Sequence, residues 1–153
     1  MKFKRFISVF LLCACLAGLF LTPAAGALEV PDIQAKAALL ADVNTDAVAY
    51  AKNIHEKNYP ASLTKIMTCL LALENGNLSD VVTVSASALD DLDADSSVAG
   101  LQVGEQMTLD DMLKAICISS ANDAAVAVAE LVGGSEPAFV EQMNARAAQL
   151  GME

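Results

Sequence analysis

The second half of this chain consists mostly of segments with helical apolar spacing, separated by glycine and by capping residues. From Ser62 onward the apolar residues recur at helical intervals, and Gly76 stands where a helix would end. Thr108 precedes two aspartates, which suits the start of a helix because carboxylates stabilise its positive end. We expect four helices: from Ser62 to the Gly76 cap, from the Thr108 cap to about Ile118, from the end of "SSAND" to Gly133-Gly134, and from the Ser135 cap to about Leu150.

Short β segments accompany these helices. Two apolar runs, Ala37–Ala41 and Ala47–Ala51, flank the turn-prone segment Val43–Asp46, which is typical of a hairpin. A further short strand is expected from Val81. At 153 residues the chain is long enough for one domain with a core, and two full domains are not expected. The pattern predicts a mixed α/β (α+β) fold, with a helical part and an antiparallel sheet.

The first 27 residues have the pattern of a secretory signal peptide. Basic residues in "MKFKR" precede an apolar run, Phe6–Leu21, and small residues follow up to Ala27. An uncleaved membrane anchor is the alternative, but the break at Pro23 and the small residues favour cleavage after Ala27. A lipid-modified Cys15 is disfavoured because most of the apolar run would lie after the cut. We therefore expect residues 1–27 to direct export and residues 28–153 to form the mature part.

Export changes the charge and the cysteine content. Loss of three basic leader residues takes the net charge of −10 to −13, which excludes nucleic acid as a favoured partner. Cys69 and Cys117 remain, too few for a disulfide framework and in the wrong pattern for zinc. They could pair or be small buried residues, and we expect burial.

The acidic run "DDLDADSS" imitates the start of a calcium loop through Asp91, Asp93 and Asp95. Ser96 stands where such a loop needs glycine, and Gln102 stands where it needs a bidentate carboxylate. We therefore interpret the run as a solvated loop, and we expect no metal and no cofactor.

Ser62 and Lys65 are candidates for nucleophilic catalysis. Residues three apart share one face of a helix, so the two side chains would lie within reach of each other. A serine hydroxyl needs a base, and the single histidine, His55, lies in the polar stretch "KNIHEKNYP", where a surface loop is expected. The amine of Lys65 is then the available base. Alone, however, this spacing is common in helices, and serine is an ordinary helix cap.

A second pair, Ser120 and Asn122, lies between two of the expected helices. A short connection there could direct a hydroxyl and an amide into one cleft, although serine and asparagine are also frequent in capping turns. The Ser-x-x-Lys and Ser-x-Asn pairs are two of the three signatures shared by penicillin-binding proteins and class A β-lactamases.

The surrounding segments "PASLTKIMT", "GLQVGEQMTLDDML" and "SSANDAAVAVAE" closely resemble the low-molecular-mass D-alanyl-D-alanine carboxypeptidases, serine peptidases that trim peptidoglycan stem peptides. The resemblance extends from Leu28 to Glu153 and implies a DD-peptidase/β-lactamase-like fold. It implies that Ser62 is the acyl-ester nucleophile and Lys65 its general base. It further implies that Ser120 transfers a proton to the leaving D-alanine, and that Asn122 binds Lys65 and the substrate amide. The implied partners are stem peptides ending in D-Ala-D-Ala and β-lactams, which would acylate Ser62.

The third family signature, Lys-Thr-Gly, is absent from this sequence. We therefore expect residues 28–153 to be the N-terminal part of a catalytic domain whose sheet is incomplete, with membrane association possible through a missing C-terminal segment. Two alternatives remain open: a class A β-lactamase, which would need a glutamate to activate the deacylating water, and a non-catalytic product that binds cell-wall peptides weakly or fails to fold.

Overall fold

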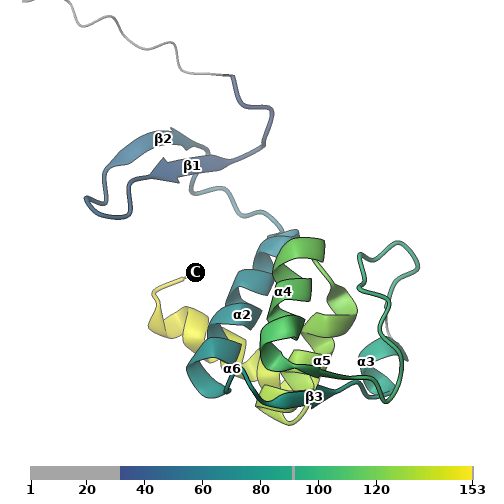
Figure 1. The fold of residues 1–153 in the computed structure, drawn as a ribbon. Helices are drawn as coiled ribbons and strands as arrows, with labels where there is room; N and C mark the ends of the chain where they lie inside the picture. Colours follow the sequence, from purple (N-terminus) through teal and green to yellow (C-terminus); the bar gives the residue numbers. More distant parts are fainter. Residues whose placement is uncertain (1–31, 91, 153) are drawn as a thin grey trace, which may run out of the picture. The chain divides into compact units, whose positions relative to one another are not determined.

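The computed structural model describes residues 32–90 and 92–152, so the expected signal peptide at 1–27 lies outside the described residues. The chain divides into two compact units, Met1–Lys57 and Asn58–Glu153. We describe each unit separately (Figure 1).

In the first unit, strands β1 (Ala38–Ala41) and β2 (Val48–Lys52) form the expected antiparallel hairpin. The Asp42 carboxylate accepts hydrogen bonds from the backbone N–H groups of Asn44 and Thr45, which fixes the turn between the strands. This confirms the predicted hairpin and its turn. His55 is exposed, as expected for a loop residue.

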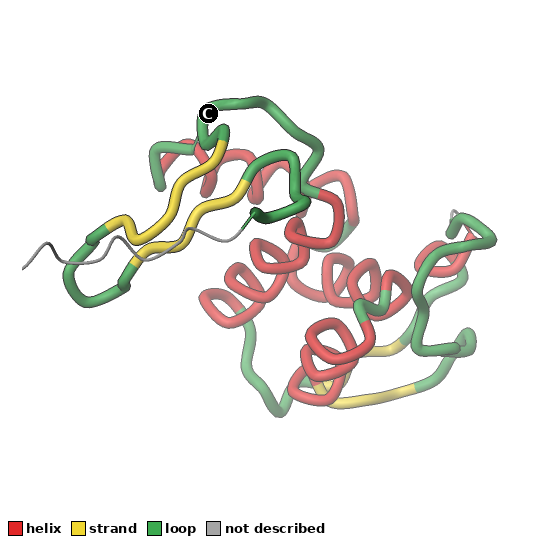
Figure 2. Tube along the Cα trace, turned by 90° about the horizontal axis from the view of Figure 1, so that it is seen from above, coloured by secondary structure: helices red, strands yellow, loops and turns green. Residues whose placement is uncertain are grey.

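The second unit is mainly helical and carries a short two-stranded ribbon. Helices α4 (Leu109–Ser119) and α5 (Asn122–Gly133) pack against this ribbon, which pairs two antiparallel strands (Figure 2). The elements of this unit are the 3-10 turn η1 (Ala61–Leu63), the helices α2 (Thr64–Asn75), α3 (Ser87–Asp90), α4 (Leu109–Ser119), α5 (Asn122–Gly133) and α6 (Glu136–Gln149), and the strands β3 (Val81–Thr83) and β4 (Gln106–Thr108).

All four expected long helices are present, and α4 and α6 begin after the caps predicted for them. The Thr108 hydroxyl accepts a hydrogen bond from the Asp111 N–H, and the Ser135 hydroxyl accepts one from the Ala138 N–H. Sequence reasoning did not predict α3 or β4. Both are short, and β4 exists because it pairs with β3, a tertiary contact with no local sequence signal.

Helix α5 lies at the centre of this unit and contacts α2, α3, α4 and α6. Its buried face is largely alanine, and small side chains let neighbouring helices approach closely. A smaller cluster around buried Phe139 attaches α6, and burial of such a side chain contributes about 1.5–3 kcal/mol. The main core consists of Ala72, Val82, Val84, Ala88, Leu109, Met112, Leu113, Ile116, Ala121, Ala124, Ala127 and Val128.

Among the described residues, no helix is both long enough and apolar enough to cross a membrane.

Candidate active site

Ser62 lies at the junction where the chain enters α2. It is the middle residue of the 3-10 turn η1, so the expectation that the α-helix begins at Ser62 is wrong by two residues. Ala61 immediately before it has a left-handed φ of 47°, an unfavourable conformation for a residue with a Cβ. This tight turn leaves the Ser62 side chain exposed to solvent at the start of the helix.

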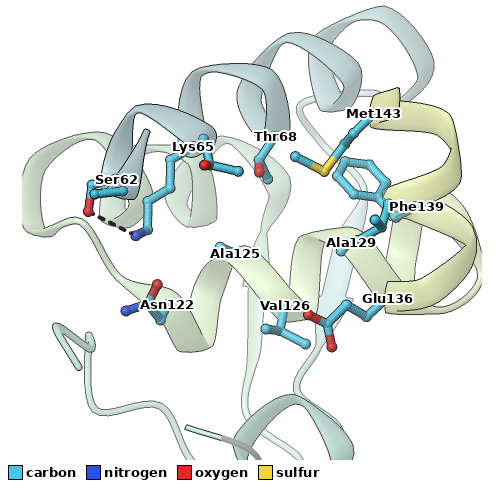
Figure 3. A pocket seen from close by; sticks show the side chains of 13 residues that line it. Ser62, Lys65, Thr68, Asn122, Ala125, Val126, Ala129, Glu136, Phe139 and Met143 are labelled. Carbon is cyan, nitrogen blue, oxygen red and sulfur yellow. Dashed lines mark hydrogen bonds between the residues drawn. The ribbon is translucent and has the colours of Figure 1, made fainter. Parts of the chain in front are cut away.

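Lys65, one turn into this segment, directs its amine at the serine. Its Nζ donates a hydrogen bond of 3.4 Å to the Ser62 Oγ (Figure 3). That distance is at the long end of the hydrogen-bond range. The structure therefore brings together the serine and lysine that sequence spacing paired.

Ser120 reaches the same hydroxyl from another helix. It caps the C-terminus of α4 with a left-handed φ of 55°, and its Oγ donates a hydrogen bond of 2.9 Å to the Ser62 Oγ. The Ser62 oxygen thus accepts hydrogen bonds from Lys65 and from Ser120. These three side chains form the polar centre of the site.

Asn122 is the first residue of α5, two positions after Ser120. It lines the same cavity as Ser62 and Lys65, on the wall opposite the lysine (Figure 3). Within the described residues, the Asn122 side chain makes no hydrogen bond to Lys65, so that expected contact is not formed here. Its backbone N–H donates to the Ser97 carbonyl at 2.8 Å, which attaches the preceding loop to the start of α5.

Asp123, which sequence reasoning did not single out, fixes this loop more firmly. Its carboxylate is 1% exposed and accepts backbone N–H bonds of 2.9–3.0 Å from Ala99, Gly100 and Leu101. It also accepts the Ala124 N–H of its own helix. Burial raises the pKa of Asp123, but the four donors outweigh burial and hold that pKa below its usual range. An aspartate directly after Ser-x-Asn at a helix start was the available signal for this role.

A cavity of about 390 Å³ opens in front of Ser62. Polar groups of Ser62, Lys65 and Asn122 lie at one end, and Phe139 and Met143 lie toward the other (Figure 3). Glu136 also lines the cavity, at the end away from Ser62 (Figure 3). The arrangement suits a ligand with a polar reacting group beside the serine and an apolar portion beyond it.

A second cavity of about 530 Å³ lies between α2 and α4. Ser62, Lys65 and Ser120 border it, and the rest of its wall is apolar or thiol. Its other lining residues are Ile66, Cys69, Leu70, Leu73, Ile116 and Cys117. Ser62 and Lys65 therefore line both cavities, and Ser120 lines the second one.

The acidic run behaves as a solvated loop where the structure describes it, with Asp93 and Asp95 exposed. Across residues 32–90 and 92–152, no group of three or more histidine, cysteine or carboxylate side chains is arranged to hold a metal ion. The expectation that both cysteines are buried is wrong, because Cys117 is exposed and Cys69 is only half-buried. Both residues line the cavity between α2 and α4.

Comparison with known proteins assigns the family. The sequence profile described as D-alanyl-D-alanine carboxypeptidase matches residues 24–153. D-alanyl-D-alanine carboxypeptidase DacF of Bacillus subtilis (strain 168) is 45% identical over 129 residues, which cover 78% of this chain and 31% of the relative. The solved structure of penicillin binding protein 5 from Haemophilus influenzae has a TM-score of 0.74 and 37% identity, and the match covers 82% of this chain and 38% of that one. The D-alanyl-D-alanine carboxypeptidase from Mycobacterium tuberculosis H37Rv gives a TM-score of 0.74 at 29% identity, over 83% of this chain and 47% of that one.

This chain therefore belongs to the D-alanyl-D-alanine carboxypeptidase family. The mixed fold expected from the sequence is confirmed by these structural similarities. The chain spans about a third of the length of the curated relatives that it matches, 31% of the Bacillus protein and 33% of a Haemophilus influenzae relative.

Proposed function

We propose that residues 28–153 supply the serine, lysine and Ser-x-Asn portion of the catalytic domain of an exported D-Ala-D-Ala carboxypeptidase. The observation that carries this proposal is the hydrogen-bonded group in which the Ser62 Oγ accepts from both Lys65 and Ser120 at the edge of a cavity. The proposed substrate is a peptidoglycan stem peptide ending in D-Ala-D-Ala.

In the proposed acylation, the Ser62 Oγ attacks the carbonyl between the two terminal D-alanines while the neutral amine of Lys65 takes its proton. The tetrahedral adduct collapses as the C–N bond breaks, and Ser120 passes its proton to the departing D-alanine nitrogen while it takes the proton held by Lys65. Water then cleaves the Ser62 ester. The N–H of Ser62, in the turn η1 that leads into α2, is proposed to stabilise the oxyanion, a contribution commonly worth a few kcal/mol.

Asn122 is proposed to bind the substrate amide, because its side chain faces Lys65 across the cavity from the first turn of α5 (Figure 3). The apolar end at Phe139 and Met143 would accept the less polar part of the stem peptide. β-Lactams, which mimic the D-Ala-D-Ala terminus, are proposed to acylate the same serine. The reaction as written uses no metal or cofactor.

The location of the activity is proposed to be the extracytoplasmic face of the membrane or the cell wall. The signal-peptide pattern at 1–27 supports export, and peptidoglycan, which carries the proposed substrate, lies outside the cytoplasm.

The alternative to the carboxypeptidase is a hydrolase similar to class A β-lactamases. It needs a glutamate beside the ester carbonyl to activate water, and Glu136 is the glutamate that lines the Ser62 cavity among the described residues. Because Glu136 lies at the end away from Ser62 (Figure 3), the geometry favours slow deacylation of a penicillin adduct. Glu136→Gln is expected to leave the deacylation rate unchanged, and a large slowing would favour the β-lactamase.

The direct test is acylation by penicillin followed by peptide mass spectrometry. The adduct is expected on the Ser62 peptide and absent in Ser62→Ala. Ser119→Ala, which removes an exposed serine next to Ser120, is the matched control and should be acylated normally. An adduct that persists in Ser62→Ala would contradict the assignment, and absence of any adduct in a folded chain that also carries the third family signature would favour the non-catalytic alternative.

A further inference from the structure

Two free thiols face each other beside the serine site. Cys69 lies on α2 and Cys117 on α4, and their Sγ atoms are 3.7 Å apart. The residues are 48 positions apart in the sequence, so only the packing of α2 against α4 brings them together. A disulfide has an S–S length of about 2.05 Å, so the sulfurs need to approach by about 1.7 Å. Rotation of the two side chains into the open cavity between the helices can supply such a shift.

The thiols lie on the same two helices as Lys65 and Ser120 and line the same cavity. Cys69 follows Lys65 by four residues on α2, so the two side chains lie on one face, one turn apart. Cys117 precedes Ser120 by three residues at the end of α4. All four residues line the same cavity of about 530 Å³. A bond between the thiols would therefore hold the two helices that carry Lys65 and Ser120.

We infer that Cys69 and Cys117 form a redox-active dithiol that closes reversibly to a disulfide and fixes α2 to α4 next to Ser62. The inference concerns these thiols and their packing, and it does not depend on the proposed peptidase activity. Export, as proposed above, would place the pair where disulfides persist.

The two thiols differ in a way that assigns their roles. Cys117 is exposed, so a dissolved disulfide can reach it. Burial first, and then the neighbouring Cys117, raise the pKa of Cys69 to about 11, so the Cys69 sulfur remains protonated and weakly nucleophilic until a partner is held beside it. Cys117 is therefore the attacking thiol and Cys69 the resolving thiol.

The oxidant is a small disulfide or the disulfide of a dithiol oxidoreductase. The Cys117 thiolate attacks one sulfur of that disulfide, whose S–S bond breaks and releases one thiol, which takes up the proton that Cys117 lost. Cys69 then loses its proton to water and attacks the Cys117 sulfur, and the mixed disulfide breaks to release the second thiol. Two protein thiols are oxidised, and one external disulfide is reduced to two thiols.

The test uses the full chain with Cys13 and Cys15 replaced by serine, so that the remaining thiols are Cys69 and Cys117, at a concentration low enough that light scattering shows the chain to be monomeric. After treatment with glutathione disulfide, peptide mass spectrometry is expected to find the Cys69 and Cys117 peptides linked within one chain, and dithiothreitol should separate them. Cys69→Ser should stop as a glutathione adduct on Cys117. Cys117→Ser should react at least 10-fold more slowly than the parent chain.

A second readout is thermal unfolding of the oxidised and reduced chain. Closing a long loop is expected to raise the melting temperature on the order of 10 °C in the parent chain and not in either serine variant. Melting curves of the reduced variants also establish that each is folded. A parent chain that keeps a stable glutathione adduct, links only between chains, or does not react under these conditions would overturn the inference.

Discussion

The Ser120 Oγ donates a hydrogen bond of 2.9 Å to the Ser62 Oγ, although the two serines are 58 positions apart in the sequence. The contact depends on the left-handed turn at Ser120, which ends α4 and directs its hydroxyl toward the start of α2. The hydrogen bonds from Ser120 and Lys65 to the Ser62 Oγ define the path along which a proton can move in the site. Substitutions in a chain that carries the third family signature test that path.

Ser120→Ala removes the hydroxyl that is proposed to pass a proton to the leaving group. Loss of a positioned acid–base group typically lowers a rate by about 100-fold or more, so turnover of a D-Ala-D-Ala peptide should fall by that factor. Steady-state release of D-alanine measures it, with Ser119→Ala as the matched control. Unchanged turnover in Ser120→Ala would remove this residue from the proton path.

Lys65→Arg keeps the positive charge and removes the base, because a guanidinium remains protonated at any pH at which the protein is folded. Acylation of Ser62 by penicillin should be abolished while the melting temperature changes little. Lys114→Arg is the control, since Lys114 is exposed and paired with Asp110 and Asp111 on α4. Acylation of Lys65→Arg at neutral pH and a normal rate would contradict the role of Lys65 as base.

Asp123→Asn tests the anchoring of the loop at residues 97–101. An amide oxygen replaces a buried carboxylate that accepts four backbone N–H bonds, and such charge-assisted bonds contribute about 1.5–3 kcal/mol each at most. We expect the free energy of unfolding to fall by about 2–4 kcal/mol at pH 7. Asp110→Asn, at an exposed position of α4, is the control and should cost less than about 1 kcal/mol.

The same substitution has a defined pH dependence. The pKa of Asp123 is lowered in the folded chain, so its charge stabilises the fold above the unfolded pKa of about 3.9. That stabilisation is lost as the pH falls through the lower, folded pKa. Urea unfolding at pH 7 and near pH 3 should therefore show the difference in stability between the parent chain and the Asp123→Asn variant shrinking on acidification. A difference that is constant over this range would mean that the charge of Asp123 contributes nothing.

Local sequence signals predicted most of this fold because most of it is locally encoded. Thr108 and Ser135 cap helices through their own side chains, and the Ser62 and Lys65 spacing alone brings their side chains together. Contacts made across the chain were harder to predict. β4 depends on pairing with β3, and Asp123 depends on a loop more than twenty positions earlier. Prediction of the thiol pair between α2 and α4 also required the packed structure. Cys69 and Cys117 are 48 positions apart, and that spacing does not indicate whether the two side chains lie together or apart.

Among the described residues, Lys65 is the one cationic side chain that lines the two cavities beside Ser62. Because Lys65 is proposed to act as the base, no second cation remains there to bind the carboxylate of a D-Ala-D-Ala peptide. The hairpin also exposes large apolar side chains, with Leu39, Leu40 and Val48 each more than half exposed (59%, 61% and 57%). Two-stranded hairpins are marginally stable alone, and exposed apolar strands associate. Residues 28–153 alone are therefore expected to release no measurable D-alanine and to aggregate.

A chimera tests this expectation on the same serine site. Residues 28–153 are joined to the part of the Bacillus subtilis relative that follows the matched region, because the match covers 31% of that relative and the third family signature is expected in the remainder. The chimera should be soluble and release D-alanine, and Ser62→Ala in the same background should abolish release. Loss of one oxyanion donor alone typically lowers the rate by about 100- to 1,000-fold, so the difference from residues 28–153 should exceed that factor. Both proteins are assayed at equal concentration with light scattering recorded, and a monomeric 28–153 chain that matches the chimera in rate would show that the described residues already form a complete site.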